Sequence, residues 1–253
     1  MQRIIRFTAL PGSIDERPSY PQPRFASIEG YSFPVSCLLS PVSYLLIAVH
    51  RKAVAHLKKV DPVLRSVIEQ VGPCRLRPMT DGSHFEFIAR AIIFQQLSTK
   101  AASTIHGRVQ TLCGGALSAD PLTRLADEEL RGAGLSRQKL SYLRDLAAHS
   151  KNGTLDTVHF PDLPDEEITR QLVQVKGVGV WTAQMFLMFR LGRPDVLPVL
   201  DLGIRKGVQR AYKLRKLPDA TRVQKIAASW APYRTVGCWY MWRVLELPMK
   251  KAA

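Results

Sequence analysis

The chain has 253 residues and carries 36 lysines and arginines against 21 aspartates and glutamates, which gives a net charge of +15 and a pI near 10.0. This length is enough to bury a sizeable core in one domain or two. So basic a chain favours polyanions such as nucleic acid as partners, although a solvated basic surface also explains the charge. The longest apolar run, residues 37–49, is interrupted by polar residues and proline and is too short to span a membrane.

The four cysteines and six histidines are dispersed along the chain. The cysteines form no C-x-x-C pair, and neither residue type has the spacing of a zinc site. The chain also lacks the closely spaced cysteines that hold an iron–sulfur cluster. We therefore expect an intracellular protein with reduced thiols and without an iron–sulfur cluster or another cofactor.

Residues 1–50 differ in composition from the rest of the chain. They contain six prolines, which break any long helix, at positions 11, 18, 21, 23, 34 and 41. We treat residues 1–50 as a basic, proline-rich extension of unknown role. Residues 51–247 then form the folded domain, and residues 248–253 form a short basic tail.

From residue 51 onward, apolar residues recur with a helical period and no convincing strand pattern appears. Asp61 before Pro62 is typical of a helix cap, and Ser83 with Glu86 has the spacing of a capping box. We expect helices at about 62–71, 83–96, 99–113, 121–131, 136–149, 165–175, 180–190, 201–212, 219–230 and 233–247. The sequence predicts an all-α fold with two helical lobes and a cleft between them.

Residues 172–183 have the pattern of a helix, a tight turn and a second helix. Gly177 and Gly179 stand two apart where one apolar helical pattern stops and the next starts. Glycine permits the positive φ and the close backbone approach that such a turn needs. The second helix then begins with N–H groups that can hold an anion such as a DNA phosphate. A Gly-x-Gly pair alone is weak evidence, since most such pairs are plain turns.

Four longer motifs in order make the pattern specific. They are residues 90–98 (RAIIFQQLS), 175–183 (VKGVGVWTA), 195–206 (DVLPVLDLGIRK) and 232–243 (PYRTVGCWYMWR). Together they resemble the helix-hairpin-helix DNA glycosylase superfamily, and the last motif resembles its alkylbase branch, the 3-methyladenine DNA glycosylase II type. The resemblance implies two helical subdomains, a DNA-binding hairpin and an active-site cleft between the subdomains.

Asp201 matches the catalytic aspartate of that superfamily. Taken alone, an Asp before Leu202 is more often a helix N-cap, and one residue can serve both roles. A carboxylate near the sugar would stabilise the positive charge that develops as the glycosidic bond breaks, and would orient or deprotonate the attacking water. Many relatives carry two adjacent aspartates, whereas Leu200 occupies the first position here; this puts a supporting contact in doubt rather than the reaction.

Trp181 occupies the position at which bifunctional members carry a nucleophilic lysine. The resemblance therefore implies a monofunctional enzyme that uses water and leaves an abasic site. Trp181 and Trp242 are also candidates for the base pocket, because an indole face attracts the positive charge of an alkylated purine. The alternative is that both are core residues, which is how we interpret their neighbours Trp239 and Tyr240.

The resemblance implies further DNA contacts. One of Gln95, Gln96 and Leu97 would fill the space left by an extruded nucleotide. The hairpin would grip phosphate through Gly177, Val178, Gly179 and Thr182, and the backbone carbonyls of Val173, Val175 and Val178 would hold a structural Na⁺ or K⁺. Arg205, Lys206 and Arg210 would contact the DNA backbone, or else form a solvated helix face.

The sequence thus predicts a monofunctional DNA N-glycosylase, acting as a monomer on duplex DNA, that excises alkylated purines of the 3-methyladenine and 7-methylguanine type. Base flipping and hydrolysis assisted by Asp201 would initiate base excision repair. Two alternatives remain: a glycosylase for another damaged or mismatched base, and a non-catalytic helix-hairpin-helix module that binds DNA. The second gives no reason for the positions of Asp201, Trp181 and Trp242.

Overall fold

The computed structural model describes residues 41–248, with side chains described from residue 49 onward, and within these bounds it contains helices and no strands. Its α-helices are α1 (Pro41–Val60), α2 (Pro62–Val71), α3 (His84–Phe94), α4 (Thr99–Leu112), α5 (Ala119–Arg124), α6 (Asp127–Gly132), α7 (Arg137–Lys151), α8 (Asp165–Leu172), α9 (Val180–Phe189), α10 (Leu202–Ala211), α11 (Ala220–Ala227) and α12 (Arg234–Val244). Two short 3₁₀ helices, η2 (Phe160–Asp162) and η3 (Ala228–Trp230), complete the set.

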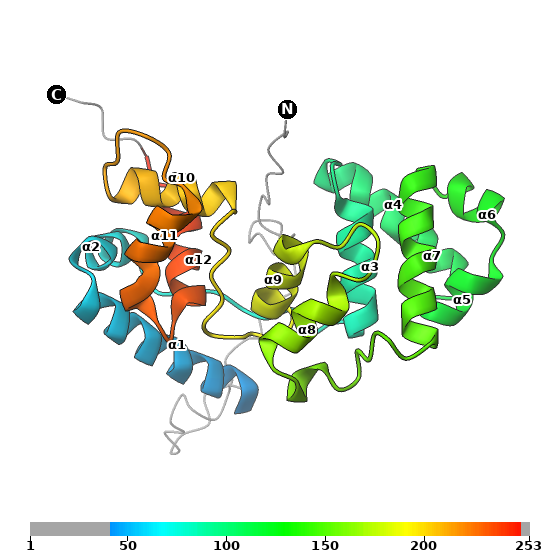
Figure 1. Cartoon of the computed structure of the whole chain (residues 1–253), viewed down its shortest axis with the longest axis horizontal. Coiled ribbons are helices and arrows are strands. Elements are labelled where there is room, and N and C mark those ends of the chain that lie inside the picture. Colours follow the sequence, from blue (N-terminus) through cyan, green and yellow to red (C-terminus); the bar gives the residue numbers. More distant parts are fainter. Residues whose placement is uncertain (1–40, 249–253) are drawn as a thin grey trace, which may run out of the picture.

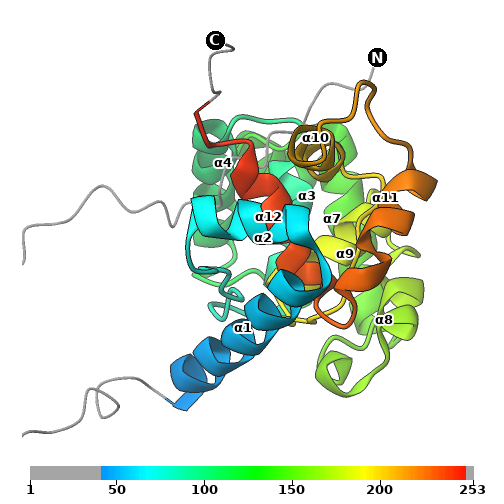
Figure 2. The same ribbon diagram turned by 90° about the vertical axis from the view of Figure 1, so that its left-hand side faces the viewer.

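The helices form two groups, which lie side by side in Figure 1 and one behind the other in Figure 2. One group packs α10, α12, α2 and α1 together with α11 and η3, and the other contains α3 to α9. The chain passes between the groups at residues 72–83 and 190–201. Arg190 ties the two connections together, because its Nη1 donates to the carbonyl oxygens of Met79 (2.5 Å) and Asp81 (2.9 Å). The predicted all-α fold in two helical lobes is confirmed.

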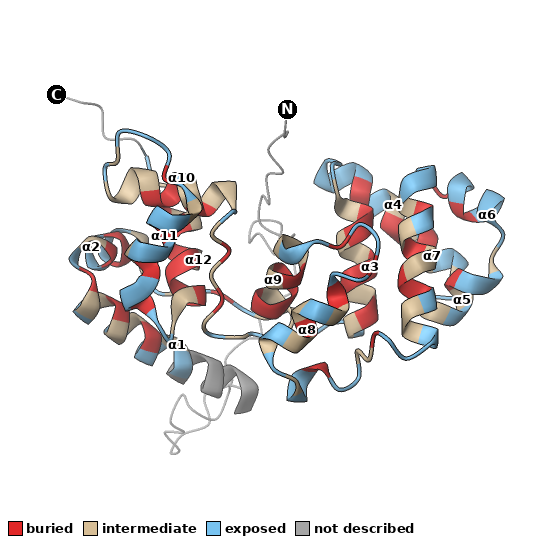
Figure 3. Cartoon of the chain, viewed as in Figure 1, coloured by how far each residue is buried: buried red, intermediate tan, exposed pale blue. Residues whose placement is uncertain are grey.

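Each group buries one face of its helices, as the buried stripes in Figure 3 show. Trp230, Tyr240, Phe160 and Phe186 are among the largest fully buried side chains. Burying an aromatic side chain of this size removes a large apolar area from water and stabilises the fold by about 2–3 kcal/mol. The core therefore gives each lobe a fixed shape on which the candidate site is built.

Asp61 is a buried carboxylate at the start of α2, with only 6% of its surface exposed. It accepts the N–H of Leu64 at 2.9 Å, as the predicted cap requires. Its other oxygen accepts the indole N–H of Trp230 at 2.9 Å and the hydroxyl of Tyr212. Three donors thus compensate the removal of this charge from water.

Helix α10 lies very close to α12, and a glycine makes this approach achievable. A Cβ at Gly207 would overlap the carbonyl oxygen of Met241 on α12. Four residues earlier on α10, a Cβ at Gly203 would stand 2.8 Å from Nε1 of Trp242 and 3.0 Å from Oδ1 of Asp201. These two small residues bring the start of α10 against the Trp242 indole.

Two sequence expectations about helix boundaries are wrong. The helix expected at 121–131 is broken into α5 and α6, because Arg144 of α7 donates to the carbonyl oxygens of Leu122 and Leu125 and binds Asp127 at 2.6 Å. We also expected the prolines to break any long helix within residues 1–50, but the last ten of these residues belong to a long helix. Helix α1 begins with Pro41 as its first residue, a position at which proline is tolerated.

Candidate active site

The turn between α8 and α9 places its two glycines in different conformations. Gly177 has φ +80°, and a Cβ there would overlap the ring of Tyr142. Gly177 therefore has both features expected of the turn, a left-handed backbone and a close approach. Gly179 has φ −99° and a Cβ there would meet nothing within 4 Å, so the same expectation is wrong for Gly179. The fold itself does not require glycine at position 179.

The open space at Gly179 adjoins the first turn of α9. Gly179 is the N-cap of that helix, and the N–H groups of a helix's first turn have no carbonyl within the helix to bond. The helix dipole places partial positive charge at the same end. A surface with exposed N–H donors, positive polarity and no side chain at Gly179 has the chemistry of a phosphate site.

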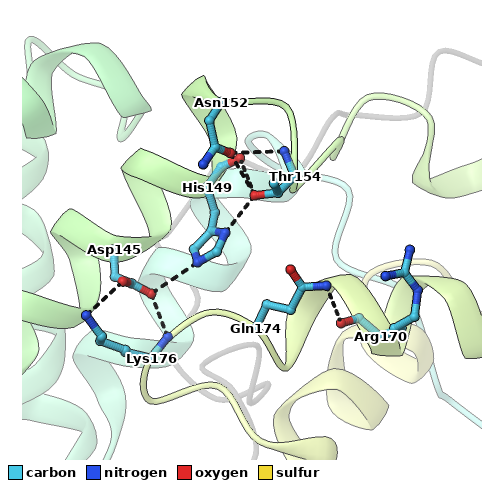
Figure 4. Close-up of polar contacts among 7 residues, drawn as sticks. All are labelled: Asp145, His149, Asn152, Thr154, Arg170, Gln174 and Lys176. Carbon is cyan, nitrogen blue, oxygen red and sulfur yellow. Dashed lines mark hydrogen bonds and ion pairs between the residues drawn. The ribbon is translucent and has the colours of Figure 1, made fainter.

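Asp145 of α7 holds the hairpin from the other side (Figure 4). Its Oδ2 accepts the backbone N–H of Lys176 at 2.8 Å, and its Oδ1 lies 3.2 Å from the Lys176 Nζ. The ring of His149 stands 3.6 Å from the same carboxylate and bonds Thr154 at 2.6 Å. Burial alone would raise the pKa of Asp145, but the bonds and charges of Lys176 and His149 lower it below its usual range.

The turn between α3 and α4 distinguishes the three residues Gln95, Gln96 and Leu97. The Gln95 side chain is half-buried and donates to the carbonyl oxygen of Gly177 at 2.8 Å. Gln96 is exposed and has φ +58°, a conformation that a residue with a side chain rarely adopts. Leu97 is 41% exposed. Gln95 thus joins this turn to the hairpin, whereas the other two side chains face outward.

A pocket of about 540 Å³ lies between this turn and the hairpin. Its wall contains residues 95–97, Gly177, Trp181 and Thr182, together with Lys139 and Tyr142 of α7. Lys139 donates from Nζ to the carbonyl oxygen of Ile93 at 2.6 Å, and burial lowers its pKa. The pocket brings the expected gap-filling and phosphate-binding residues to one place.

Asp201 accepts three N–H donors at the start of α10. Its Oδ1 accepts the backbone N–H of Ile204 at 2.7 Å and the indole N–H of Trp242 at 3.0 Å. Its Oδ2 accepts the indole N–H of Trp181 at 2.9 Å. An ionised carboxylate offers about four lone-pair positions, so one position on Oδ2 remains for a further donor. Asp201 is therefore a helix cap, and its carboxylate can still accept one more hydrogen bond.

Trp181 and Trp242 come from α9 and α12 and meet at this carboxylate. Both are half-buried and pack against the core, and the Trp242 ring lies 5.7 Å from that of Phe189, tilted by 32°. Tyr240 is fully buried and its hydroxyl donates to the carbonyl oxygen of Gly72 at 3.0 Å, so it packs as expected. Its ring contacts that of half-buried Trp239 at 4.9 Å.

The arginines on α10 serve the fold at least in part. Arg205 donates from Nε to the carbonyl oxygen of Pro218 at 2.7 Å. Arg210 donates to the carbonyl oxygens of Leu245 (3.1 Å) and Leu247 (2.6 Å) beyond α12. Lys206 is exposed on the same helix. The sequence did not single out Asp145, Lys139 or Tyr142, since the contacts that place them at the site, with Lys176, Ile93 and Gly177, span 31 or more residues.

Comparison with known proteins accounts for this arrangement. The model of the HhH-GPD superfamily of base excision DNA repair proteins matches residues 89–232, which contain the α3–α4 turn, the hairpin and Asp201. The chain belongs to the HhH-GPD superfamily. It is 34% identical over 200 residues to DNA-3-methyladenine glycosylase 1 of Schizosaccharomyces pombe, a match that covers 78% of this chain and 88% of the relative.

Two solved structures agree with this assignment. A DNA-3-methyladenine glycosidase from Bacillus halodurans is similar with a TM-score of 0.69 and 38% identity, over 75% of this chain and 87% of that one. The 3-methyladenine DNA glycosylase of S. pombe, solved in complex with abasic DNA, has a TM-score of 0.68 and 33% identity, over 78% of this chain and 97% of that one. The resemblance to the alkylbase branch is confirmed.

Membrane-spanning helices and metal-binding clusters can be looked for only among the described residues. Within residues 41–248, none of the helices is long and apolar enough to cross a bilayer. In the same part of the chain, no three side chains among His, Cys, Asp and Glu gather as a metal site would require. The N-terminal extension expected at residues 1–50 lies mostly outside the described residues, as does most of the tail expected at 248–253.

Proposed function

We propose that this protein is a monofunctional DNA N-glycosylase that removes alkylated purines from duplex DNA and leaves an abasic site. The observation that carries the proposal is the cluster in which two indoles, Trp181 and Trp242, donate to the carboxylate of Asp201. Support also comes from relatives named for 3-methyladenine, over most of the chain. A DNA-binding module without activity has no need of this cluster beside its hairpin.

In this mechanism Asp201 acts on the sugar and on water. The glycosidic bond of a purine alkylated at N3 or N7 is weakened, because the base carries a formal positive charge and leaves as a neutral molecule. As the bond breaks, positive charge passes to the sugar, where an ionised carboxylate stabilises it. The remaining lone-pair position on Oδ2 accepts a proton of the attacking water, which adds to C1′.

The indoles select the lesion in the same proposal. The face of an indole attracts a cation by about 0.5–2 kcal/mol, more in a desolvated pocket, and an undamaged purine has no such charge. Because Trp181 replaces a nucleophilic lysine, no amine attacks C1′ from that position. The amine in the neighbouring pocket, Lys139, is bonded to the carbonyl oxygen of Ile93.

The DNA contacts follow from the two turns. We assign the gap-filling role to Gln96, because Gln95 is bonded to the hairpin and Gln96 presents an exposed side chain from a left-handed backbone. The first turn of α9 and the space at Gly179 would hold a phosphate, with Lys206 as a further contact.

A monovalent cation fits the chemistry of the hairpin carbonyls. Val173, Val175 and Val178 offer neutral oxygen donors, which suit hard cations. The Val175 carbonyl accepts the N–H of Val178 at 3.0 Å and retains its second lone pair. Na⁺ or K⁺ there would supply positive charge near a DNA phosphate, and these main-chain atoms would hold it.

The test is a base-release assay on defined duplexes. Alkylated DNA, deaminated and oxidised purines and mismatched pyrimidines are compared under the same conditions with the wild-type protein. We expect release of 3-methyladenine and 7-methylguanine, and no strand cleavage. Release confined to another base would overturn the substrate class, and efficient trapping of a covalent adduct by borohydride would overturn the monofunctional mechanism. Tight binding of abasic DNA without release from any duplex would favour the non-catalytic alternative.

A further inference from the structure

The segment from the end of α10 into the first turn of α11 is strongly basic. Within residues 213–222, called here the basic loop, Lys213, Arg215, Lys216 and Arg222 are all exposed. Asp219 is the acidic residue of this stretch, and its carboxylate caps α11 by accepting the Arg222 N–H at 2.7 Å. Four cations against one carboxylate make this surface attractive to a polyanion.

Two hydrogen bonds anchor the backbone of the basic loop to α10. The N–H of Leu214 donates to the carbonyl oxygen of Gln209 at 2.9 Å, and Arg205 of α10 donates to the carbonyl oxygen of buried Pro218. The loop lines an open hollow of about 800 Å³, whose wall includes Arg215, Lys216 and Arg222. A concave, positively charged surface on an ordered backbone can hold phosphate without the cost of ordering the loop on binding.

The basic loop lies on the same side of the molecule as the hairpin. In both views of the ribbon, α10 and the loop that follows it lie at the upper side, and Figure 1 shows the start of α9 on that side. Helix α10 begins directly after Asp201 and its ten residues end at the loop. At a rise of about 1.5 Å per residue, the part of the loop next to the end of α10, residues 213–216, stands roughly 15 Å from Asp201. Pro218 lies back against Arg205, nearer to Asp201.

We propose that the basic loop is a second contact for the DNA backbone, about four to five base pairs from the nucleotide held at Asp201. The spacing applies to residues 213–216, with α10 taken to run along the duplex, and it follows from the length of α10 and the rise of about 3.4 Å per base pair. The inference rests on the proposed function, which places the extruded nucleotide at Asp201. The contact is with phosphate and therefore carries no sequence preference.

The experiment compares two variants with the same change in charge. Arg215→Gln with Lys216→Gln removes two cations from the basic loop. Arg51→Gln with Lys52→Gln removes two exposed cations from α1, which lies along the lower side in Figure 1. Thermal unfolding checks that both variants keep the wild-type fold. The probe is a duplex with a tetrahydrofuran abasic site, and its affinity is measured by fluorescence anisotropy between 50 and 200 mM salt.

On a duplex with ten base pairs on each side of the abasic site, the loop variant should bind more weakly than wild type. The slope of log affinity against log salt should fall by up to about 2, since each lost phosphate contact contributes about 0.9. The α1 variant should retain the wild-type slope. When the duplex is cut to three base pairs on one particular side, the loop variant and wild type should bind equally. Cutting the other side should preserve their difference.

Two results would overturn the proposal. One is a loop variant with the wild-type slope on the long duplex. The other is a deficit that persists whichever side of the duplex is cut, which would indicate general charge attraction to DNA rather than a contact at a defined position. Failure of the proposed function is a separate outcome, because it appears as absence of base release by the wild-type protein. If the loop contact and the proposed function are both correct, the loop variant at saturating protein concentration releases bases as fast as wild type.

Discussion

The indole nitrogen of Trp181 donates a hydrogen bond of 2.9 Å to Oδ2 of Asp201. The two residues belong to α9 and to the start of α10, on opposite sides of the second connection between the lobes. The bond therefore fixes the orientation of the carboxylate relative to the hairpin that would grip DNA. Trp242 adds a second indole bond from α12, so three helices determine where this carboxylate points.

Replacement of Trp181 by phenylalanine should distinguish the contribution of its aromatic ring from that of its hydrogen bond to Asp201. The ring face remains and the bond to Asp201 is lost, so the base-release rate should fall about tenfold to a hundredfold, as expected for a bond to a charged group worth about 1.5–3 kcal/mol. The measurement is single-turnover release from methylated duplex. Trp239→Phe, outside the cluster, is the matched control and should keep the wild-type rate. Equal rates for both variants would contradict the positioning role of Trp181.

Replacement of Gln96 by glycine should move stability and activity in opposite directions. Its φ of +58° costs a residue with a side chain about 1–2 kcal/mol, which glycine avoids, so the free energy of unfolding should rise by up to about 1 kcal/mol. Excision from duplex DNA should nevertheless slow, because the gap-filling side chain is gone. Leu97→Ala, a neighbouring truncation, should slow excision less. Denaturant unfolding and excision assays test both effects, and unimpaired excision by Gln96→Gly would remove Gln96 from its assigned role.

The two hairpin glycines should respond differently to alanine. Gly177→Ala requires a strained φ and overlaps the ring of Tyr142, so it should lower the free energy of unfolding by more than about 2 kcal/mol. Gly179→Ala meets no atom within 4 Å and should leave thermal stability unchanged. Its methyl group would instead stand where a phosphate approaches, so affinity for duplex DNA should fall. Wild-type affinity in a folded Gly179→Ala protein would argue against a phosphate there.

Asp145 should give the protein a pH-dependent stability. Because its pKa is lowered in the folded state, its stabilising effect is complete above its ordinary value of 3.8 and is lost as the pH falls through the lower folded value. Asp145→Asn keeps an oxygen that can accept the Lys176 N–H but has no charge. This variant should be less stable at pH 7 and should lose less stability on acidification than wild type. Thermal unfolding between pH 3 and 7 makes the comparison, and parallel curves would contradict it.

Contacts between residues near one another in the chain could be predicted from the sequence. The caps at Asp61, Ser83 and Asp201 join a side chain to an N–H three residues ahead, so their spacing alone predicts them. The Ser83–Glu86 pair forms the predicted cap bond, while the Glu86 carboxylate accepts from Gln110 of α4 at 3.1 Å. The fold class followed for the same reason, because helical periodicity is a local property.

Contacts between residues far apart in the chain could not be predicted from the sequence. Gln95 and Gly177 are 82 residues apart, and neither residue type indicates the bond between them. The break between α5 and α6 depends on Arg144, which has no sequence relation to Leu125. Gly207 is required by a carbonyl on α12, whereas a glycine inside a helix otherwise indicates only lower stability. Tertiary packing decides each of these features.

The central claim is tested most directly by base release from methylated duplex DNA with Asp201→Asn. Asparagine is as good a helix cap as aspartate and can still accept the Ile204 N–H, so the variant should fold and bind abasic duplex with nearly wild-type affinity. Without the negative charge, release of 3-methyladenine and 7-methylguanine should fall by at least about a hundredfold. Release at the wild-type rate by the folded variant would contradict the assignment of Asp201 as the catalytic residue.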